Sequence, residues 1–241
     1  DKMRAAANKR GFKAVPMTGL KATATINQTI EFKESRNVIG TVKGSEAPHE
    51  HLLLMGHWDH LGKGTSSDPN EDVINNGAID NATGTAAILE IGEKIAAGPK
   101  PKRSVTVLAV TLEESGLRGS AYFGENPLIP LKDIVAGVNI DAMQPTGPAK
   151  DIVVVGAGAS QLEDTLKAIL AENNRVIRPD PSPQNGYFYR SDHISLAKKG
   201  VPMLYADSGI DLIVGGEAAG EAAGKDYTDN RYHKPADEYS D

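Results

Sequence analysis

The chain contains no cysteine and no long apolar run. Without cysteine there is no disulfide bond, no thiolate zinc site and no cysteine nucleophile, so any bound metal must be held by histidine and carboxylate side chains. No stretch approaches the ~20 apolar residues that a membrane span needs, although a hydrophobic fraction of 39% is ordinary for a globular protein. We therefore expect a soluble chain with no membrane span.

An excess of positive charge is also absent. The formal net charge is -6, and the basic residues are scattered along the sequence, whereas nucleic-acid-binding domains concentrate them on one face. We therefore expect no nucleic-acid partner. The opening "DKMRAAANKRGF" has neither an initiator methionine nor a charged and then apolar signal sequence, and we interpret the chain as a processed or truncated piece.

Short apolar runs alternate with helical segments from residue 51 onward. The runs 51–56, 104–111, 134–140, 151–156 and 201–206 are typical of strands covered on both faces. The intervening segments that favour helices are 83–97, 117–126, 160–174 and 193–200. This alternation predicts an α/β fold with a mostly parallel, mixed central sheet and helices on both faces.

The two ends of the chain have a different character. Residues 1–10 suit a short helix, and residues 23–32 and 36–44 alternate like two strands joined by a polar turn. Residues 209–233 are rich in glycine, alanine and acids, and we predict a mobile surface loop there, with the role of 209–228 left open.

Polar residues follow the apolar runs at the points where side chains of a parallel sheet converge on a ligand. His57 and Asp59 follow the first run, Glu113 and Glu114 the second, and Asp141 the third. Asp80 precedes a helix in "NNGAIDNATGTA", and His233 lies in "RYHKPADEY". The two histidines and three of the five carboxylates form a ligand set suited to zinc or a similar divalent ion.

The two carboxylates of this group that are not counted as ligands have other expected roles: one orients a ligand, and the other accepts a proton. Residues i and i+2 of a strand point the same way, so Asp59 is expected behind His57, orienting its ring. The pair Glu113-Glu114 would be costly to desolvate unless cations neutralise it or one acid is protonated. A metal site gives the two acids different tasks, since one binds the metal while the other accepts a proton from water.

Each feature alone has a simpler explanation. The H-x-D segment is usually a hydrogen-bonded loop, adjacent glutamates usually begin a solvated helix, and a single histidine such as His233 is usually on the surface. Asp80 and Asp141 alone suit caps, and Asp192 with His193 suits a helix cap as well as an active-site floor. Their joint placement at strand and loop ends favours a metal site, without Asp192 or His193 as ligands.

The segments "GHWDHLG", "NNGAIDNATGTAAILEI", "TLEESGLRGS", "VNIDAM", "YFYRSDHISLAKKGVPMLY" and "YHKPADEY" resemble the bacterial leucyl-type di-zinc aminopeptidases. These are co-catalytic zinc metallopeptidases related to glutamate carboxypeptidase II and glutaminyl cyclase. The resemblance covers about residues 36 to 239 in the order of that family. It implies a three-layer sandwich of the zinc-exopeptidase type, with residues 36–241 as the di-zinc peptidase domain. Residues 1–35 then resemble a lead-in segment from a protease-associated domain.

The resemblance also implies a role for each candidate residue. Asp80 would bridge two zinc ions, with His57 and Asp141 completing one and Glu114 and His233 the other. Glu113 would be the general base, Asp59 the carboxylate behind His57, and Tyr232 a residue that holds the substrate carbonyl oxygen.

The implied activity is that of an exopeptidase that hydrolyses the N-terminal bond of peptides with a free N-terminus, through water activated by two Zn²⁺ per chain. A periplasmic or secreted location is an expectation from the same resemblance. The alternatives are a glutaminyl cyclase-like acyl transferase, a carboxypeptidase-like or aminoacylase-like hydrolase, and an inactive binding module such as the transferrin receptor. Ligand losses expected of such a module are not visible here.

Overall fold

The computed structural model describes residues 2–239, and the chain divides between Glu34 and Ser35 into two compact units. The described part of the first unit contains one helix, α1 (Lys2–Ala7), within the range predicted for it. The strand predicted over residues 23–32 is wrong, because that segment pairs with no other strand. Its apolar side chains are exposed, with Phe32 at 97%, so alternation alone did not produce a sheet.

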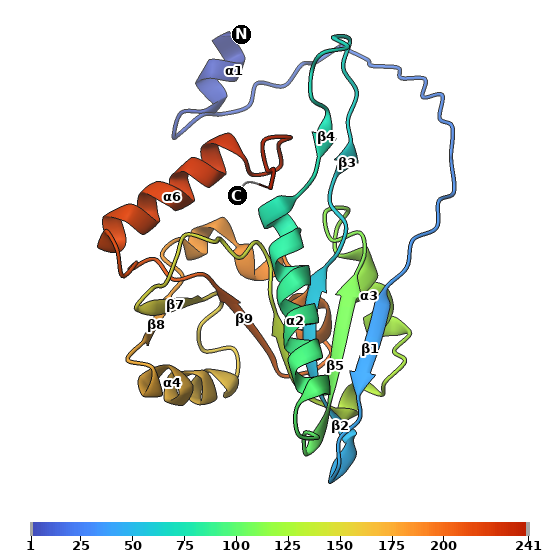
Figure 1. Cartoon of the computed structure of the whole chain (residues 1–241). Helices are drawn as coiled ribbons and strands as arrows, with labels where there is room; N and C mark the ends of the chain where they lie inside the picture. Colours follow the sequence, from blue (N-terminus) through green and yellow to red (C-terminus); the bar gives the residue numbers. More distant parts are fainter. Residues whose placement is uncertain (1, 240–241) are drawn as a thin grey trace. The chain divides into compact units, whose positions relative to one another are not determined.

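The second unit is built on a seven-stranded sheet in the order β1-β5-β2-β6-β9-β7-β8 (Figure 1). Its strands are β1 (Val38–Val42), β2 (Ala47–His57), β5 (Arg103–Val110), β6 (Ile134–Asn139), β7 (Asp151–Val154), β8 (Val176–Pro179) and β9 (Met203–Asp207). Strands β5, β2, β6 and β9 run parallel, whereas β1 and β7 pair antiparallel with β5 and β9. The predicted mixed α/β sheet is confirmed.

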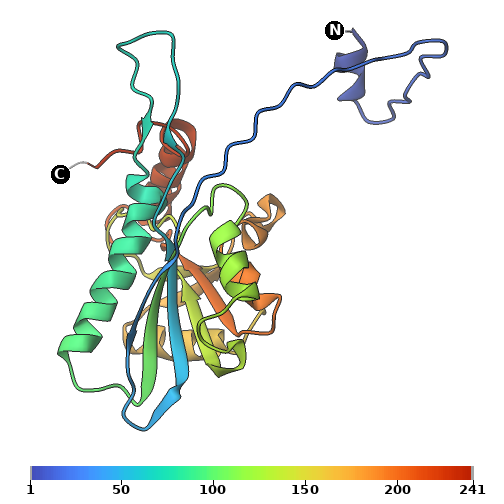
Figure 2. The same ribbon diagram turned by 90° about the vertical axis from the view of Figure 1, so that its right-hand side faces the viewer.

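Helices lie on both faces of this sheet. Figure 2 shows α2 (Gly84–Ala97) on one face and α3 (Arg118–Glu125) on the other. The remaining helical elements are α4 (Leu162–Glu172), α5 (His193–Ala197) and α6 (Gly216–Asn230), with the short turns η1 (Ala78–Thr83), η2 (Leu131–Asp133), η3 (Pro183–Asn185) and η4 (Tyr187–Tyr189). Two short strands, β3 (Gly62–Lys63) and β4 (Ile74–Asn75), form a separate hairpin. In the described part of the chain, every helix is too short or too polar to cross a membrane.

The main apolar core fixes the central strands. It packs Met55 of β2 and Val110 of β5, both fully buried, with Phe123 of α3, Leu196 of α5 and Met203 of β9. Burial of each such side chain stabilises the fold by about 1.5–3 kcal/mol. Because these residues stand close to the carboxyl ends of β2 and β5, the core holds those strand ends in place.

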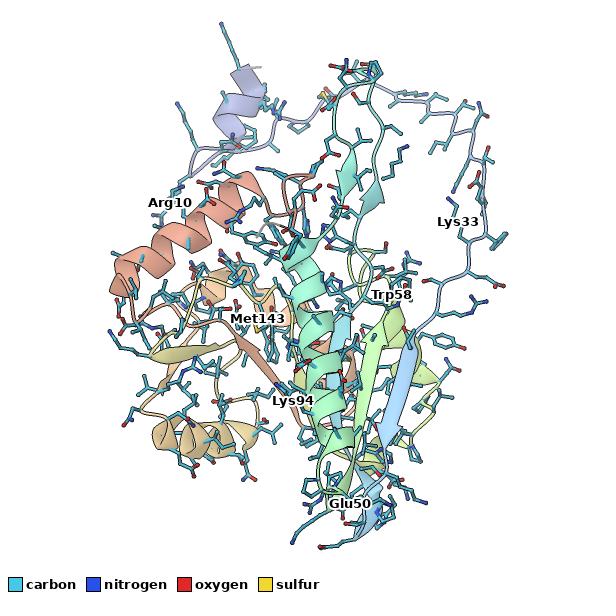
Figure 3. All side chains as sticks on the ribbon, in the orientation of Figure 1. Arg10, Lys33, Glu50, Trp58, Lys94 and Met143 are labelled. Carbon is cyan, nitrogen blue, oxygen red and sulfur yellow. The ribbon has the colours of Figure 1, made fainter. Side chains whose placement is uncertain are left out.

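The strand register brings three chain segments to one edge of the sheet. His57 at the end of β2 stands opposite Val110, the last residue of β5, and Met55 stands opposite Asn139, the last residue of β6. Figure 3 shows Glu50, in the first half of β2, and Trp58, directly after it, at opposite ends of the sheet. The polar residues that follow β2, β5 and β6 therefore converge at the Trp58 end.

The predicted mobile loop over 209–228 is largely wrong, because residues Gly216–Asn230 form α6. One of the glycines that suggested flexibility, Gly220, instead permits close packing. A Cβ added at Gly220 would lie 2.1 Å from the carbonyl oxygen of Ile210. Alanine and glutamate in "GEAAGEAAG" favour a helix. Gly220 is needed for the contact with Ile210, so its presence does not indicate a loop.

Candidate metal centre

His57 is positioned by the end of β2 and by two hydrogen bonds. Its side chain is 1% exposed, and its Nδ1 lies 2.8 Å from the main-chain carbonyl oxygen of Asp59. The Thr85 hydroxyl donates to the His57 carbonyl at 2.7 Å. Since a carbonyl only accepts, Nδ1 carries a proton, and Nε2 is directed into the site.

The side chain of Asp59 does not contact the His57 ring in the expected way. Its carboxylate accepts a hydrogen bond from the Thr111 hydroxyl at 2.7 Å and bonds from the Leu112 main-chain N–H at 2.8 and 3.0 Å. The expected support of His57 therefore comes from the Asp59 carbonyl. The Asp59 carboxylate instead holds the loop that leads from β5 to Glu113.

Asp80 lies in η1, and a distant acid fixes its main chain. The buried Asp237 carboxylate accepts from the N–H groups of Ile79 at 2.9 Å and Asp80 at 3.0 Å. The peptide bond between Asp80 and Asn81 is cis. Gly77 precedes this turn with φ 65°, and a Cβ there would lie 2.2 Å from the Asp80 carbonyl oxygen. Only glycine fits this position, so the turn presents Asp80 in one orientation.

Asp141 follows β6 and is held from two directions. The Ser191 hydroxyl donates to its carboxylate and in turn accepts from the Asn139 amide at 2.7 Å. The Asn81 side chain joins the Asp80 and Asp141 loops, because its amide donates to the Ile140 carbonyl at 2.9 Å and its oxygen accepts from the Ala142 N–H at 3.1 Å. The two aspartates are thus carried on one hydrogen-bonded unit.

Several site loops contain residues in the left-handed region of φ. Leu112, directly before Glu113, has φ 57°, Ala142, directly after Asp141, has φ 52°, and His233 itself has φ 56°. Such conformations are unfavourable for residues other than glycine and cluster at functional sites. At Leu112 and Ala142 they redirect the chain just after strands β5 and β6, and at His233 just after α6.

Tyr232 and His233 form one aromatic unit at the opposite side of the site. Their rings stack with centroids 3.8 Å apart, and the Tyr232 hydroxyl accepts a hydrogen bond from Arg190 at 3.1 Å. Burial raises the pKa of Tyr232 well above its ordinary value. The phenol therefore remains protonated at neutral pH and keeps a proton to donate toward the site.

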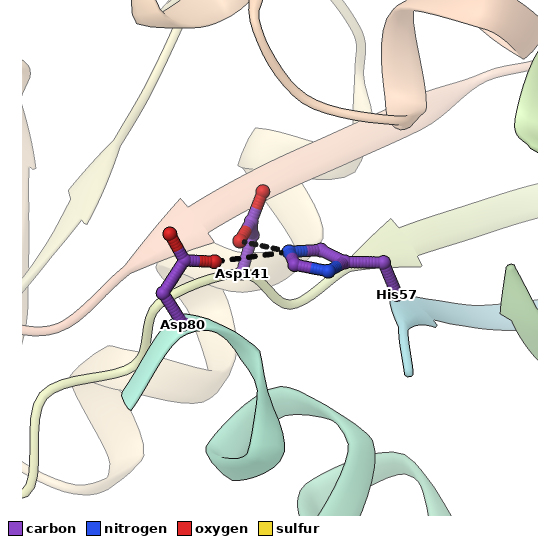
Figure 4. A group of neighbouring side chains, drawn as sticks. All are labelled: His57, Asp80 and Asp141. Carbon is purple, nitrogen blue, oxygen red and sulfur yellow. Dashed lines mark hydrogen bonds and ion pairs between the residues drawn. The ribbon is translucent and has the colours of Figure 1, made fainter. Parts of the chain in front are cut away.

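The structure brings all five predicted ligands together. His57 Nε2 lies 3.1 Å from Asp80 Oδ1 and 3.2 Å from Asp141 Oδ1 (Figure 4). His233 Nε2 lies 3.3 Å from Asp80 Oδ2 and 3.1 Å from Glu114 Oε2. The two oxygens of Asp80 thus face two different groups of donor atoms.

These distances fit the demands of a divalent ion. Bonds of about 2.0–2.1 Å in tetrahedral geometry place neighbouring ligand atoms roughly 3.3 Å apart. The separations of 3.1–3.3 Å between nitrogen and oxygen in both groups match that edge. The donor set of imidazole and carboxylate suits zinc or a related ion. The residues present on each side of Asp80 therefore fit a divalent metal ion.

Three titratable groups of the site have pKa values well above their ordinary values. Burial and the nearby Asp141 carboxylate raise the pKa of Glu113 to about 9. Burial opposes protonation of His57, but bonds to Asp141 and Asp80 raise its pKa to about 12. Bonds to Asp80 and Glu114 raise the pKa of His233 to about 9. Protons therefore occupy this cluster of acids at neutral pH when no cation does.

Zinc binding is accordingly expected to displace protons. A pH of 7 lies below the raised pKa values of His57, His233 and Glu113, so all three groups are protonated before zinc binds. We therefore expect two to three protons to leave per chain as zinc binds. Apparent zinc affinity should therefore fall as the pH is lowered. Calorimetric titration at pH 7 in buffers with different ionisation enthalpies measures this release, and a binding heat independent of buffer would contradict it.

Sequence reasoning missed His60 as a member of this site. Its Nδ1 lies 2.7 Å from Glu114 Oε1, and its ring meets that of His233 with centroids 5.6 Å apart. Donor atoms of His60, Asp80 and Glu114 all lie within 4.8 Å of one another. The only sequence signal was its place in "GHWDHLG", directly after the pair His57 and Asp59.

The site opens into a cavity of about 940 Å³ that also adjoins α6. This volume lies in the range of pockets that hold small organic ligands and short peptides. Five tyrosines line it together with acids and a few basic side chains; the tyrosines are Tyr187, Tyr189, Tyr205, Tyr227 and Tyr232, and the basic residues are Arg178, Arg190 and Lys225. The candidate ligands form one wall of the cavity, in reach of a bound molecule.

The family model described as "Peptidase family M28" matches residues 37–241. Among curated proteins, "Probable glutamate carboxypeptidase VP8" of Zea mays is 31% identical over 129 residues, which cover 51% of this chain and 16% of that protein. The match thus spans about a sixth of the length of this relative.

Solved structures share the fold at low sequence identity. A zinc aminopeptidase from Bacillus subtilis aligns with TM-score 0.53 and 20% identity, over 71% of this chain and 39% of that one. A glutaminyl cyclase from Porphyromonas gingivalis aligns with TM-score 0.52 and 19% identity, over 71% of this chain and 62% of that one. These similarities show the fold alone, because the same sheet carries proteins named for different reactions.

Proposed function

Because the chain belongs to peptidase family M28, we propose that it is a zinc-dependent exopeptidase that removes the N-terminal residue of peptides. The single observation that carries the proposal is the placement of the two Asp80 oxygens toward two separate His and carboxylate groups, in a site that also contains the buried acid Glu113. His57, Asp80, Glu114, Asp141 and His233 would hold the divalent ions, which would supply the Lewis acidity that lowers the pKa of water and polarises the scissile carbonyl.

The residues of the chain supply the proton transfers. Burial and the nearby Asp141 carboxylate raise the pKa of Glu113, and positive charge beside it would lower that pKa again, so that Glu113 could act as a base at neutral pH. Glu113 then accepts the proton of the attacking water and passes it to the leaving amine. Tyr232, with its high pKa and its bond from Arg190, donates a hydrogen bond to the substrate carbonyl oxygen as charge develops on it.

The charge of the cavity favours a substrate with a free amine. Acids outnumber basic side chains in its lining, and two of the three basic residues are already paired. Arg178 bonds to Asp151 and Glu217, and Lys225 bonds to Asp229. An N-terminal ammonium therefore finds more partners there than a C-terminal carboxylate does.

Arg190 favours a second candidate, a carboxypeptidase of the kind named for the maize relative. In the described residues this guanidinium forms no ion pair with a carboxylate; it bonds to the Tyr232 hydroxyl and lies 5.3 Å from the centroid of the Tyr187 ring. A guanidinium so placed in a cavity is able to bind the carboxylate of an acidic substrate residue. The substrate chemistry therefore decides between the two candidates.

A substrate panel on the zinc-loaded protein tests the proposal. We expect elemental analysis to find about two zinc ions per chain and the protein to cleave a leucyl anilide but not its N-acylated form, with full loss of cleavage in chelator. Cleavage of N-acylated dipeptides instead would indicate the carboxypeptidase, and ammonia release from an N-terminal glutaminyl peptide would indicate a cyclase. Failure to bind zinc after reconstitution would contradict every metal-dependent candidate.

A further inference from the structure

The His60 imidazole lies inside the metal centre beside the Glu114 carboxylate, without a hydrogen bond of regular geometry. Its side chain is 4% exposed and that of Glu114 is 9% exposed. Although His60 Nδ1 and Glu114 Oε1 lie 2.7 Å apart, neither atom makes a hydrogen bond of acceptable geometry, and the same is true of His60 Nε2. Leaving a buried polar group without a partner costs about 1–3 kcal/mol, so the arrangement calls for a partner of another kind.

The close approach of His60 and Glu114 without a regular hydrogen bond is what a shared cation would produce. In a hydrogen bond the N–H points at the oxygen, whereas two ligands of one ion direct their lone pairs at a common point between them. His60, Asp80 and Glu114 contribute donor atoms that lie within 4.8 Å of one another. Asp80 and Glu114 are also the two acids that His233 contacts.

The packing around His60 holds its ring in this orientation. A Cβ added to Gly77 would lie 2.7 Å from His60 Cγ, so the imidazole rests directly against the glycine main chain. The other side of the site is closed by the His233 ring, which meets His60 edge to face. His60 is therefore fixed by the same turn that presents Asp80.

We propose that His60 is a further nitrogen ligand of the ion held by Asp80, Glu114 and His233. The inference rests on the proposed two-metal centre and deepens it. The two ions then differ: one has three protein ligands, His57, Asp80 and Asp141, and the other has four. Three protein ligands are the pattern of a catalytic zinc with an open position, whereas four approach the closed set of a structural zinc.

Histidine nitrogen spectra of the protein during zinc titration test this assignment directly. The chain has six histidines, and the nitrogen resonances of an imidazole change strongly when it binds a metal. We expect three histidines to show this change at two equivalents of zinc, and one of the three signals to be missing in His60→Ala. Change at only two histidines would overturn the role of His60 and leave the proposed function intact, whereas change at none would overturn both.

Zinc affinity provides a second readout that does not depend on activity. His60→Ala should weaken the binding of one zinc by at least about tenfold in competition with a chromophoric chelator, and leave the other unchanged. His60→Gln, which keeps a polar side chain of similar size, serves if the alanine variant does not fold. His49→Ala, at an exposed histidine on β2, is the matched control and should bind both ions as the parent does. Unchanged affinity in both His60 variants would overturn the proposal.

Discussion

Replacing Glu113 by glutamine should abolish most of the peptidase activity without removing zinc. Glutamine keeps the shape of the side chain but accepts no proton, and loss of a general base typically lowers kcat by about 10²- to 10⁴-fold. His57, Asp141 and His233 each lie within 3.3 Å of another candidate ligand, whereas neither candidate metal group among the described residues contains Glu113. Steady-state kinetics on a leucyl anilide, with elemental analysis of the same sample, measures both quantities.

The control for this variant is an exposed glutamate on α2. Glu93 lies outside the cavity lining, and Glu93→Gln should retain the kcat and the zinc content of the parent. Full activity in Glu113→Gln would remove the proposed general base. Loss of zinc together with activity would instead show that Glu113 is a ligand, in conflict with the role assigned to it.

Replacing Asp80 by alanine should prevent the binding of both ions, because its two oxygens face the two groups separately. The affinity for each ion is expected to fall at least about 100-fold, and activity should be lost with it. Equilibrium dialysis against zinc followed by elemental analysis gives the number of ions retained. Far-UV circular dichroism on the same samples checks that the fold survives.

Asp141→Ala is the matched comparison for Asp80→Ala. Both residues are buried aspartates of the same site, but Asp141 contacts only the His57 group. This variant should keep about one zinc ion per chain. Equal zinc content in the two variants would contradict a bridging role for Asp80.

Much of the fold and the ligand positions followed from local sequence patterns. Continuous apolar runs ending in His57, Glu113 and Asp141 located three strands, and parallel pairing brought their ends to one edge of the sheet. This prediction needed no knowledge of distant contacts. The helix over Gly216–Asn230 was missed because its glycines look flexible in the sequence, whereas Gly220 meets Ile210 at close range only in the folded chain.

The assignments of Asp59 and His60 show a second limit. The alternation of side chains that placed Asp59 behind His57 holds only within a strand, and β2 ends at His57. Beyond that point the chain turns, so the Asp59 carboxylate reaches Leu112 while His60 faces Glu114. The role of Asp237 in holding the main chain of Asp80 could likewise not be predicted from the sequence. Its hydrogen bonds to Ile79 and Asp80 join positions more than 150 residues apart.

The attachment of η1 to Asp237 affects when the site becomes complete. His233 contacts Asp80 and Glu114, and Asp237 holds the main chain of Asp80 from the same short segment. During synthesis this segment leaves the ribosome only after every strand of the sheet has done so. A nascent chain can therefore release all the strands of its sheet before it gains the contacts that align Asp80, so we expect this site to be completed late in folding.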